Sequence, residues 1–114
     1  MDDEKLRLLT VVVQRKLGER VLEAALNAGA TGATFFYAQG TGVRQTLGFL
    51  GQFIEAEKQV VFVVTSEQKV NEVLAAVTKA GELNKAGYGF AYVQEVLKAV
   101  GFVDADKPVG TKGS

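Results

Sequence analysis

The chain has 114 residues, with 13 basic and 13 acidic side chains and neither cysteine nor histidine. This length suits one domain with its own core. The missing residue types exclude disulfides, zinc–sulfur sites and catalysis by a thiolate or an imidazole, and we expect no metal site. The balanced charge excludes a basic surface for nucleic acid. The acidic N-terminus is unlike a signal peptide and no apolar run is long enough to span a membrane, so we expect a cytoplasmic protein without membrane insertion.

The first half of the chain has the pattern strand, helix, strand. Residues 6–13 are a run of Leu, Val and Thr interrupted only by Arg7, which is typical of a central strand. Apolar residues at helical spacing follow over 15–29, and Gly29 is placed to end this helix. The aromatic residues of the segment 33–39 predict a second strand.

The second half repeats this pattern. Residues 59–64 predict a third strand. The helix that follows is expected to begin with a capping box at Thr65 and Gln68 and to stop at Gly81. The segment 87–93 leads into a fourth strand.

The element order βαββαβ predicts an α+β fold of the ferredoxin-like type, an antiparallel four-stranded sheet with two helices on one face. We expect one domain over 1–103 and a flexible C-terminal tail over 104–114. The alternate strand residues that would face away from the helices are nearly all apolar. A monomer would expose them, so the pattern predicts association through the open face of the sheet.

The connection between the second and third strands, residues 40–58, is unusually apolar for a loop. Its large apolar side chains are Leu47, Phe49, Leu50, Phe53 and Ile54. Exposing them would give up burial of roughly 1.5–3 kcal/mol each. They are therefore expected to bury against the domain, a sister subunit or another protein. A segment presented to a partner and an element packed permanently at the rim of an oligomer both fit this pattern.

Three short motifs resemble those of the nitrogen-regulatory PII signal proteins, and the similarity extends over about residues 6–103. "AGATGAT" at 28–34 resembles the family's helix-to-strand turn. "QGTGVRQ" at 39–45 resembles the base of the long T-loop, and "NKAGYGFAYV" at 84–93 resembles the B-loop. The resemblance implies a homotrimer packed sheet to sheet, with an adenine nucleotide between subunits and a T-loop that contacts the regulated target.

The same resemblance implies which residues contact the effector. These are Gly40, Gly42, Arg44, Gln45, Lys58, Lys85, Gly87, Tyr88, Gly89 and Phe90. From the residues alone, the glycines also fit ordinary turns or bulges, and the cations also fit solvated side chains. Both alternatives stay open at this point.

The chain departs from the family pattern at the phosphate-binding positions. Tyr88 and Phe90 stand where the B-loop usually has Asp and Lys, and Gly101 and Val103 stand where two arginines are usual. Each charge-assisted hydrogen bond contributes about 1.5–3 kcal/mol, so ATP bound in the usual way is not expected. The two aromatic rings instead predict a stacking wall for a nucleoside, a monophosphate or an apolar-faced metabolite. The segment 41–58 also lacks the tyrosine that the family uridylylates.

The functional hypothesis is a PII-like trimeric regulator that binds a small anionic effector, such as AMP, ADP, ATP or a related metabolite. It would regulate a partner protein, such as a membrane transporter, through the T-loop at 40–58. The alternative is a ferredoxin-like oligomeric interaction module that senses no small molecule. No enzymatic activity is expected, because no catalytic constellation emerges from the sequence.

Overall fold

The structure is a computed structural model that describes residues 5–39 and 57–101. Its elements, in chain order, are β1 (Leu6–Gln14), a short 3-10 helix η1 (Arg15–Leu17), α1 (Gly18–Asn27), β2 (Thr34–Gln39), β3 (Glu57–Ser66), α2 (Glu67–Ala80) and β4 (Gly89–Val96). This order confirms the predicted βαββαβ pattern. The tail expected at 104–114 lies outside the described residues.

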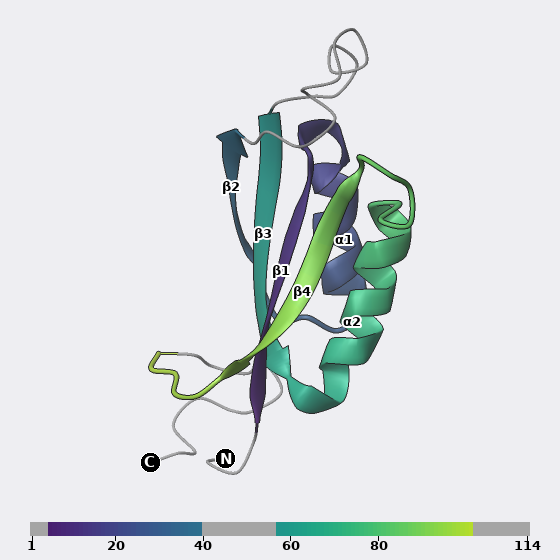
Figure 1. The fold of residues 1–114 in the computed structure, drawn as a ribbon. Helices are drawn as coiled ribbons and strands as arrows, with labels where there is room; N and C mark the ends of the chain where they lie inside the picture. Colours follow the sequence, from purple (N-terminus) through teal and green to yellow (C-terminus); the bar gives the residue numbers. More distant parts are fainter. Residues whose placement is uncertain (1–4, 40–56, 102–114) are drawn as a thin grey trace, which may run out of the picture.

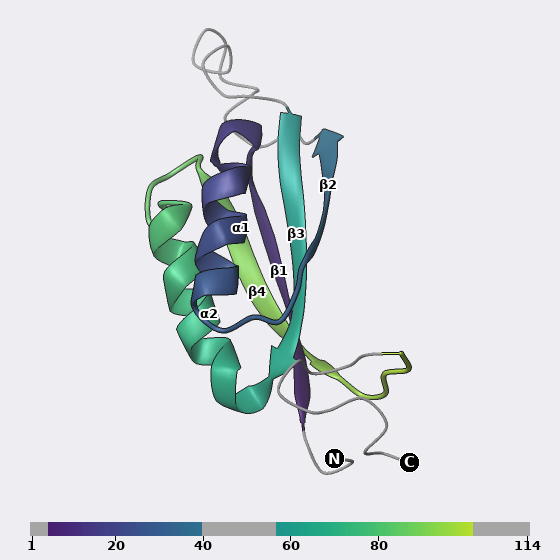
Figure 2. The same ribbon diagram turned by 180° about the vertical axis from the view of Figure 1, so that it is seen from behind.

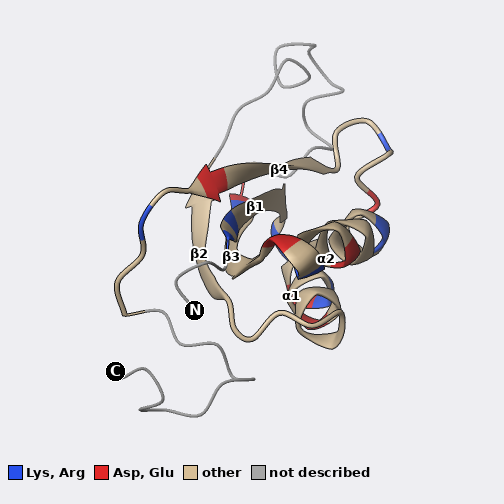
Figure 3. Ribbon diagram, turned by 90° about the horizontal axis from the view of Figure 1, so that it is seen from below, with Lys and Arg blue, Asp and Glu red and all other residues tan. Residues whose placement is uncertain are grey.

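The strands form one antiparallel sheet in the order β2-β3-β1-β4. Both helices lie on the same side of this sheet, as the two opposite views show (Figures 1 and 2). A view along the strands shows the helices as one layer and the sheet as the other (Figure 3). The predicted α+β, ferredoxin-like fold is therefore confirmed.

The hydrophobic core fills the space between the helices and the sheet. Every second residue of β1 points into it, as expected for a pleated strand. The side chains that are buried completely, or nearly so, include Leu9, Val11 and Val13 of β1, Val61 and Val63 of β3, Val21 and Ala25 of α1, and Val73 and Val77 of α2. The apolar stripe of each helix thus meets the same face of the two central strands.

Helix α1 ends as the sequence predicts. Gly29 has a φ of 117°, in the region that favours glycine. Its N–H donates to the carbonyl of Leu26 at 3.2 Å, and the N–H of Ala30 donates to the carbonyl of Ala25 at 3.1 Å. These two bonds form a Schellman motif, which satisfies carbonyl groups that the end of a helix would otherwise leave unpaired.

Helix α2 begins later than the sequence predicts. Its N-cap is Ser66 rather than Thr65, and no side-chain hydrogen bond caps it. Thr65 is still part of β3, where it pairs with Arg7 of β1 and is buried. The capping-box prediction is wrong because strand pairing continues past Thr65 and keeps that residue in the sheet.

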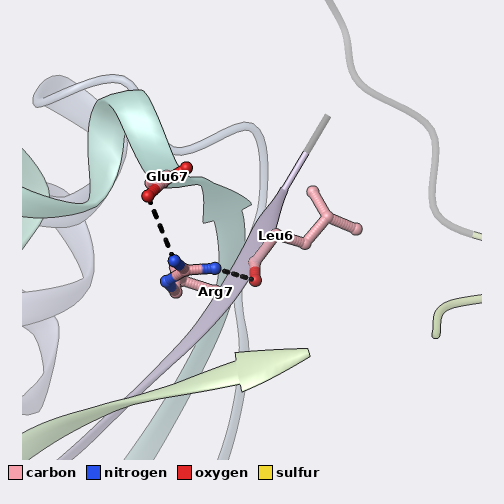
Figure 4. Close-up of polar contacts among 3 residues, drawn as sticks. All are labelled: Leu6, Arg7 and Glu67. Atoms are coloured by element: carbon pink, nitrogen blue, oxygen red, sulfur yellow. Dashed lines mark hydrogen bonds and ion pairs between the residues drawn. The ribbon is translucent and has the colours of Figure 1, made fainter. Parts of the chain in front are cut away.

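The contacts that hold the start of α2 come from β1 and the residue before it (Figure 4). The N–H of Glu67 donates to the carbonyl of Lys5 at 2.9 Å. Arg7 donates from Nη2 to Oε2 of Glu67 at 3.2 Å and from Nη1 to the carbonyl of Leu6 at 3.1 Å. A neighbouring strand thus satisfies a donor that a side-chain cap often satisfies.

Helix α2 ends at Gly81, as predicted, but Gly81 itself stays in a right-handed conformation. Glu82 takes the left-handed one, with a φ of 52°. The N–H of Glu82 donates to the carbonyl of Lys79 at 3.2 Å, and that of Leu83 donates to the carbonyl of Thr78 at 3.0 Å. Gly81 instead lies in a tight space, because a Cβ there would lie 3.2 Å from side-chain carbons of three neighbours.

The face of the sheet away from the helices is apolar, and no helix or strand of the described residues covers it. Phe36, Phe62, Phe90 and Tyr92 lie on it with exposed fractions between 36% and 54%. Thr10 lies between Phe62 and Tyr92 in the strand register and is only 4% exposed, since larger neighbours flank it. We call this surface the open face. No helix in the described part of the chain is both long and apolar enough to cross a membrane.

Candidate functional site

Many of the residues predicted to bind an effector or a partner fall in the segment that the structure does not describe. The effector-binding candidates outside the described residues are Gly40, Gly42, Arg44 and Gln45, and the partner-binding candidates outside them are Leu47, Phe49, Leu50, Phe53 and Ile54. Their roles stay predictions. The remaining candidates lie in β3 and in the segment that leads into β4.

Lys58 lies near the start of β3. The strand register places it opposite Gln14 of β1 and Ala38 of β2, and it is half-buried. Alternation along β3 puts Lys58 on the same side as Val60 and Phe62, which is the open face. Lys58 thus lies at the end of the open face, one residue after the first described residue of β3.

The two predicted B-loop glycines are both required by the backbone. Gly87 has a φ of 83° and Gly89 a φ of 153°. A Cβ on Gly89 would lie 2.2 Å from the carbonyl oxygen of Val12 and 3.0 Å from the Cα of Val13. Gln14 donates from Nε2 to the carbonyl of Gly87 at 3.2 Å, which holds the loop against β1.

Lys85 is held by contacts within the chain. Its Nζ lies 2.6 Å from Oε1 of Glu82 and 5.5 Å from the ring centroid of Tyr88. Lys85 lowers the pKa of Glu82 through its hydrogen bond and its positive charge. Arg20 adds to this effect, since its Nη2 lies 3.5 Å from Oε2 of Glu82. Glu82 in turn raises the pKa of Lys85. An anion that binds Lys85 therefore competes with the Glu82 carboxylate.

The aromatic residues of this segment do not form one wall within a single chain. Tyr88 is partly buried and packs against the hydrophobic core. Phe90 lies on the open face, where its ring stacks on Tyr92 at 6.2 Å between centroids and 13° between planes. Only Phe90 offers a largely exposed ring for stacking, with 54% of the residue exposed.

Lys58 and the segment 84–90 lie on opposite sides of β1 within one chain. β3, which carries Lys58, pairs with one edge of β1, and β4 pairs with the other edge. Two strand spacings amount to about 10 Å. Gln14 of β1 lies between the two groups, because it is opposite Lys58 in the register and its Nε2 donates to the carbonyl of Gly87.

A cluster that the sequence analysis missed lies beside the described ends of the 40–56 connection. Arg15 donates from Nη1 to Oε1 of Glu57 at 2.9 Å, and its guanidinium carbon lies 4.6 Å from the ring centroid of Tyr37. The hydrogen bond to Glu57 is the main cause that raises the pKa of Arg15. The three residues come from η1, β3 and β2, so only the strand register could have revealed the contact.

Acidic side chains do not gather into a metal site within residues 5–39 and 57–101. No group of three or more potential metal-ligating side chains lies close together there.

Comparison with known proteins identifies the family. The model of the family described as "Nitrogen regulatory protein P-II" matches residues 6–102. A search of curated proteins found no match.

Solved structures share the fold. A protein described as PII-like and signalling, from Thermus thermophilus, is 24% identical, with a TM-score of 0.60 over 81% of this chain and 86% of that one. Arabidopsis thaliana PII, solved with citrate bound, is 20% identical, with a TM-score of 0.62 over 84% of this chain and 81% of that one. With the family match over nearly the whole described fold, these findings show that the chain belongs to the nitrogen regulatory protein P-II family.

Proposed function

We propose that this chain is a PII-like signal-transduction protein that works as a homotrimer in the cytoplasm. The observation that carries the proposal is the uncovered, aromatic open face of the sheet, in a chain of the P-II family. An apolar surface of this kind is stable in water when another copy covers it. Each subunit would be one domain over residues 1–103, with a flexible C-terminal tail over 104–114.

The proposed effector is a small anion, such as an adenine nucleotide or a related metabolite, bound between subunits. Lys58 and the 40–45 segment of one subunit would face Lys85 and the 87–90 segment of the next. Membership of the P-II family supports a site shared by two copies. The citrate bound to Arabidopsis PII also supports a small anion.

The proposed output is the 40–58 segment, the T-loop, which would regulate a partner such as a membrane transporter. Its large apolar side chains would bury against that partner. An effector shifts the loop toward one state only as far as it binds that state more tightly than the other.

A second candidate, an oligomeric interaction module without an effector, is favoured by one observation. Lys85 is already paired with Glu82 at 2.6 Å, so its charge is neutralised without a ligand.

Isothermal titration of the full chain separates the two candidates. The panel is AMP, ADP, ATP, cyclic nucleotides, bicarbonate, 2-oxoglutarate and citrate. The sensor proposal expects saturable binding of at least one compound, which the variant Arg44→Ala, Lys58→Ala, Lys85→Ala weakens at least tenfold, since each lost charged hydrogen bond contributes about 1.5 kcal/mol or more.

The matched control is Lys5→Ala, Lys79→Ala, Lys98→Ala, which removes the same charge from exposed positions elsewhere. It should leave binding unchanged. No binding across the panel, or equal loss in both triple variants, would contradict effector sensing and leave the interaction module.

A further inference from the structure

A cleft of about 570 Å³ lies on the helix side of the sheet, at the edge that carries β2. It exists because α1 packs against α2 and β3, so β2 extends beyond the helix layer (Figure 2). The residues that line it are Arg15, Lys16, Glu19, Leu22, Phe35, Tyr37 and Gln59. Its volume falls within the range of about 300–1,000 Å³ that is usual for small-molecule sites.

The floor of the cleft contains a buried amide that makes no hydrogen bond to another described residue. Gln59 is only 4% exposed, and within residues 5–39 and 57–101 its side chain makes no hydrogen bond. It lies directly under Gly18, where a Cβ would come within 1.8 Å of the Gln59 Oε1. A buried amide that is left unpaired costs stability, so its retention needs a reason. A ligand in the cleft that hydrogen-bonds to this amide provides one.

The walls of the cleft suit a flat ring. Phe35 and Tyr37 alternate with the open-face residues of β2 and present their rings on the helix side, 6.3 Å apart and at 75° to each other. They are 44% and 57% exposed. Arg15 lies over Tyr37, so the exposed ring surface of Phe35 is the free stacking partner.

The charges around the cleft suit a single negative charge. Arg15 is already neutralised by Glu57 at 2.9 Å. Glu19 lies in the first turn of α1, where a carboxylate is favourable beside the helix N-terminus. Two cations line the cleft, Arg15 and Lys16, and Lys16 makes no ion pair with a described residue. A di- or triphosphate in the cleft would lie near Lys16 and also near the Glu19 carboxylate. Repulsion between the phosphates and this carboxylate disfavours such a ligand.

We propose that this cleft binds a planar heteroaromatic monoanion, with its ring against Phe35, its hydrogen-bonding edge on the Gln59 amide and its charge near Lys16. The site lies on the opposite side of the sheet from Lys58 and Phe90. It shares no residue with the proposed effector site.

Nicotinate is the probe, because it combines a flat ring, a ring nitrogen that accepts a hydrogen bond and one carboxylate. Three analogues each remove one feature: benzoate lacks the ring nitrogen, nicotinamide lacks the charge and cyclohexanecarboxylate lacks the aromatic ring. The full chain is titrated with each, and affinity is read from amide chemical shifts, including the side-chain amide of Gln59. Nicotinate should bind about fivefold more tightly than benzoate because of one neutral hydrogen bond.

Two variants assign the contacts. Gln59→Met keeps the shape of the side chain and removes the amide, so it should abolish the preference for nicotinate over benzoate while leaving benzoate affinity unchanged. Lys16→Gln should weaken nicotinate about fivefold and leave nicotinamide unchanged. Lys16 is exposed, so this variant tests the site even if Gln59→Met does not fold.

The matched control is Lys79→Gln on α2, which should change none of the affinities. The proposal is overturned if no probe shifts the Gln59 amide at millimolar concentration. It is also overturned if the preference for nicotinate survives Gln59→Met.

Discussion

The open face offers a test in which one strand provides both the variant and its control. Phe35 and Phe36 are neighbours in β2, and they are 44% and 43% exposed on opposite faces of the sheet. Phe36→Ala should weaken association through the open face, whereas Phe35→Ala should not. Residue type, exposure and strand position are nearly identical, so only the face differs.

The magnitude follows from the exposed area. An aromatic residue of roughly 200 Å² that is 43% exposed offers about 85 Å² for burial. At about 25 cal/mol per Å², this corresponds to about 2 kcal/mol per subunit. In the proposed trimer, three subunits would give about 6 kcal/mol, or a change of about 10⁴ in the trimer dissociation constant.

Sedimentation equilibrium across a dilution series measures this change. The Phe36→Ala variant should dissociate at concentrations where the unchanged protein and the Phe35→Ala variant remain associated. Equal dissociation of both variants, or of neither, would refute the assignment of the interface to the open face.

Two further predictions concern stability. Gly89→Ala should lower the free energy of unfolding by about 3 kcal/mol, because a Cβ there would lie 2.2 Å from the carbonyl oxygen of Val12. The control is Gly32→Ala, which should have little effect because no atom lies within 4 Å of the added Cβ. Urea denaturation measures both changes. The pKa of Glu82 is lowered by Lys85 from its ordinary value of 4.5, so its stabilising contribution is present above that value and is lost as the pH falls through the lower folded value. Unfolding measured over this acidic range should therefore depend less on pH in Glu82→Gln, and an unchanged slope would disprove the linkage.

Most of the fold could be predicted from the sequence because its signals are local. The run of Leu and Val in β1 and the glycine at position 29 each depend on a few neighbouring residues. The start of α2 was misplaced because Thr65 satisfies a local capping pattern that pairing with Arg7 overrides. Glu82 in the left-handed position could not be predicted either, since Gly81 is the better local candidate and is held by packing instead.

Less of the candidate site could be predicted. A motif predicts Lys85 and Tyr88 as site residues, but it does not reveal that Glu82 holds Lys85 or that Tyr88 packs against the core. The buried amide of Gln59, which has no hydrogen-bond partner within the described segments, was missed because its burial depends on which strand residue lies beneath Gly18. Contacts of this kind follow from strand register and helix placement, which a single sequence specifies only indirectly.

The pairing of Gln39 with Glu57 has an evolutionary consequence. Because the sheet itself brings these two residues together, the scaffold does not depend on the length or composition of the chain that joins them. Doubling such a connection costs only about 0.6 kcal/mol of closure entropy. Insertions, deletions and new recognition sequences can therefore accumulate between these two anchors while the sheet and its core remain unchanged.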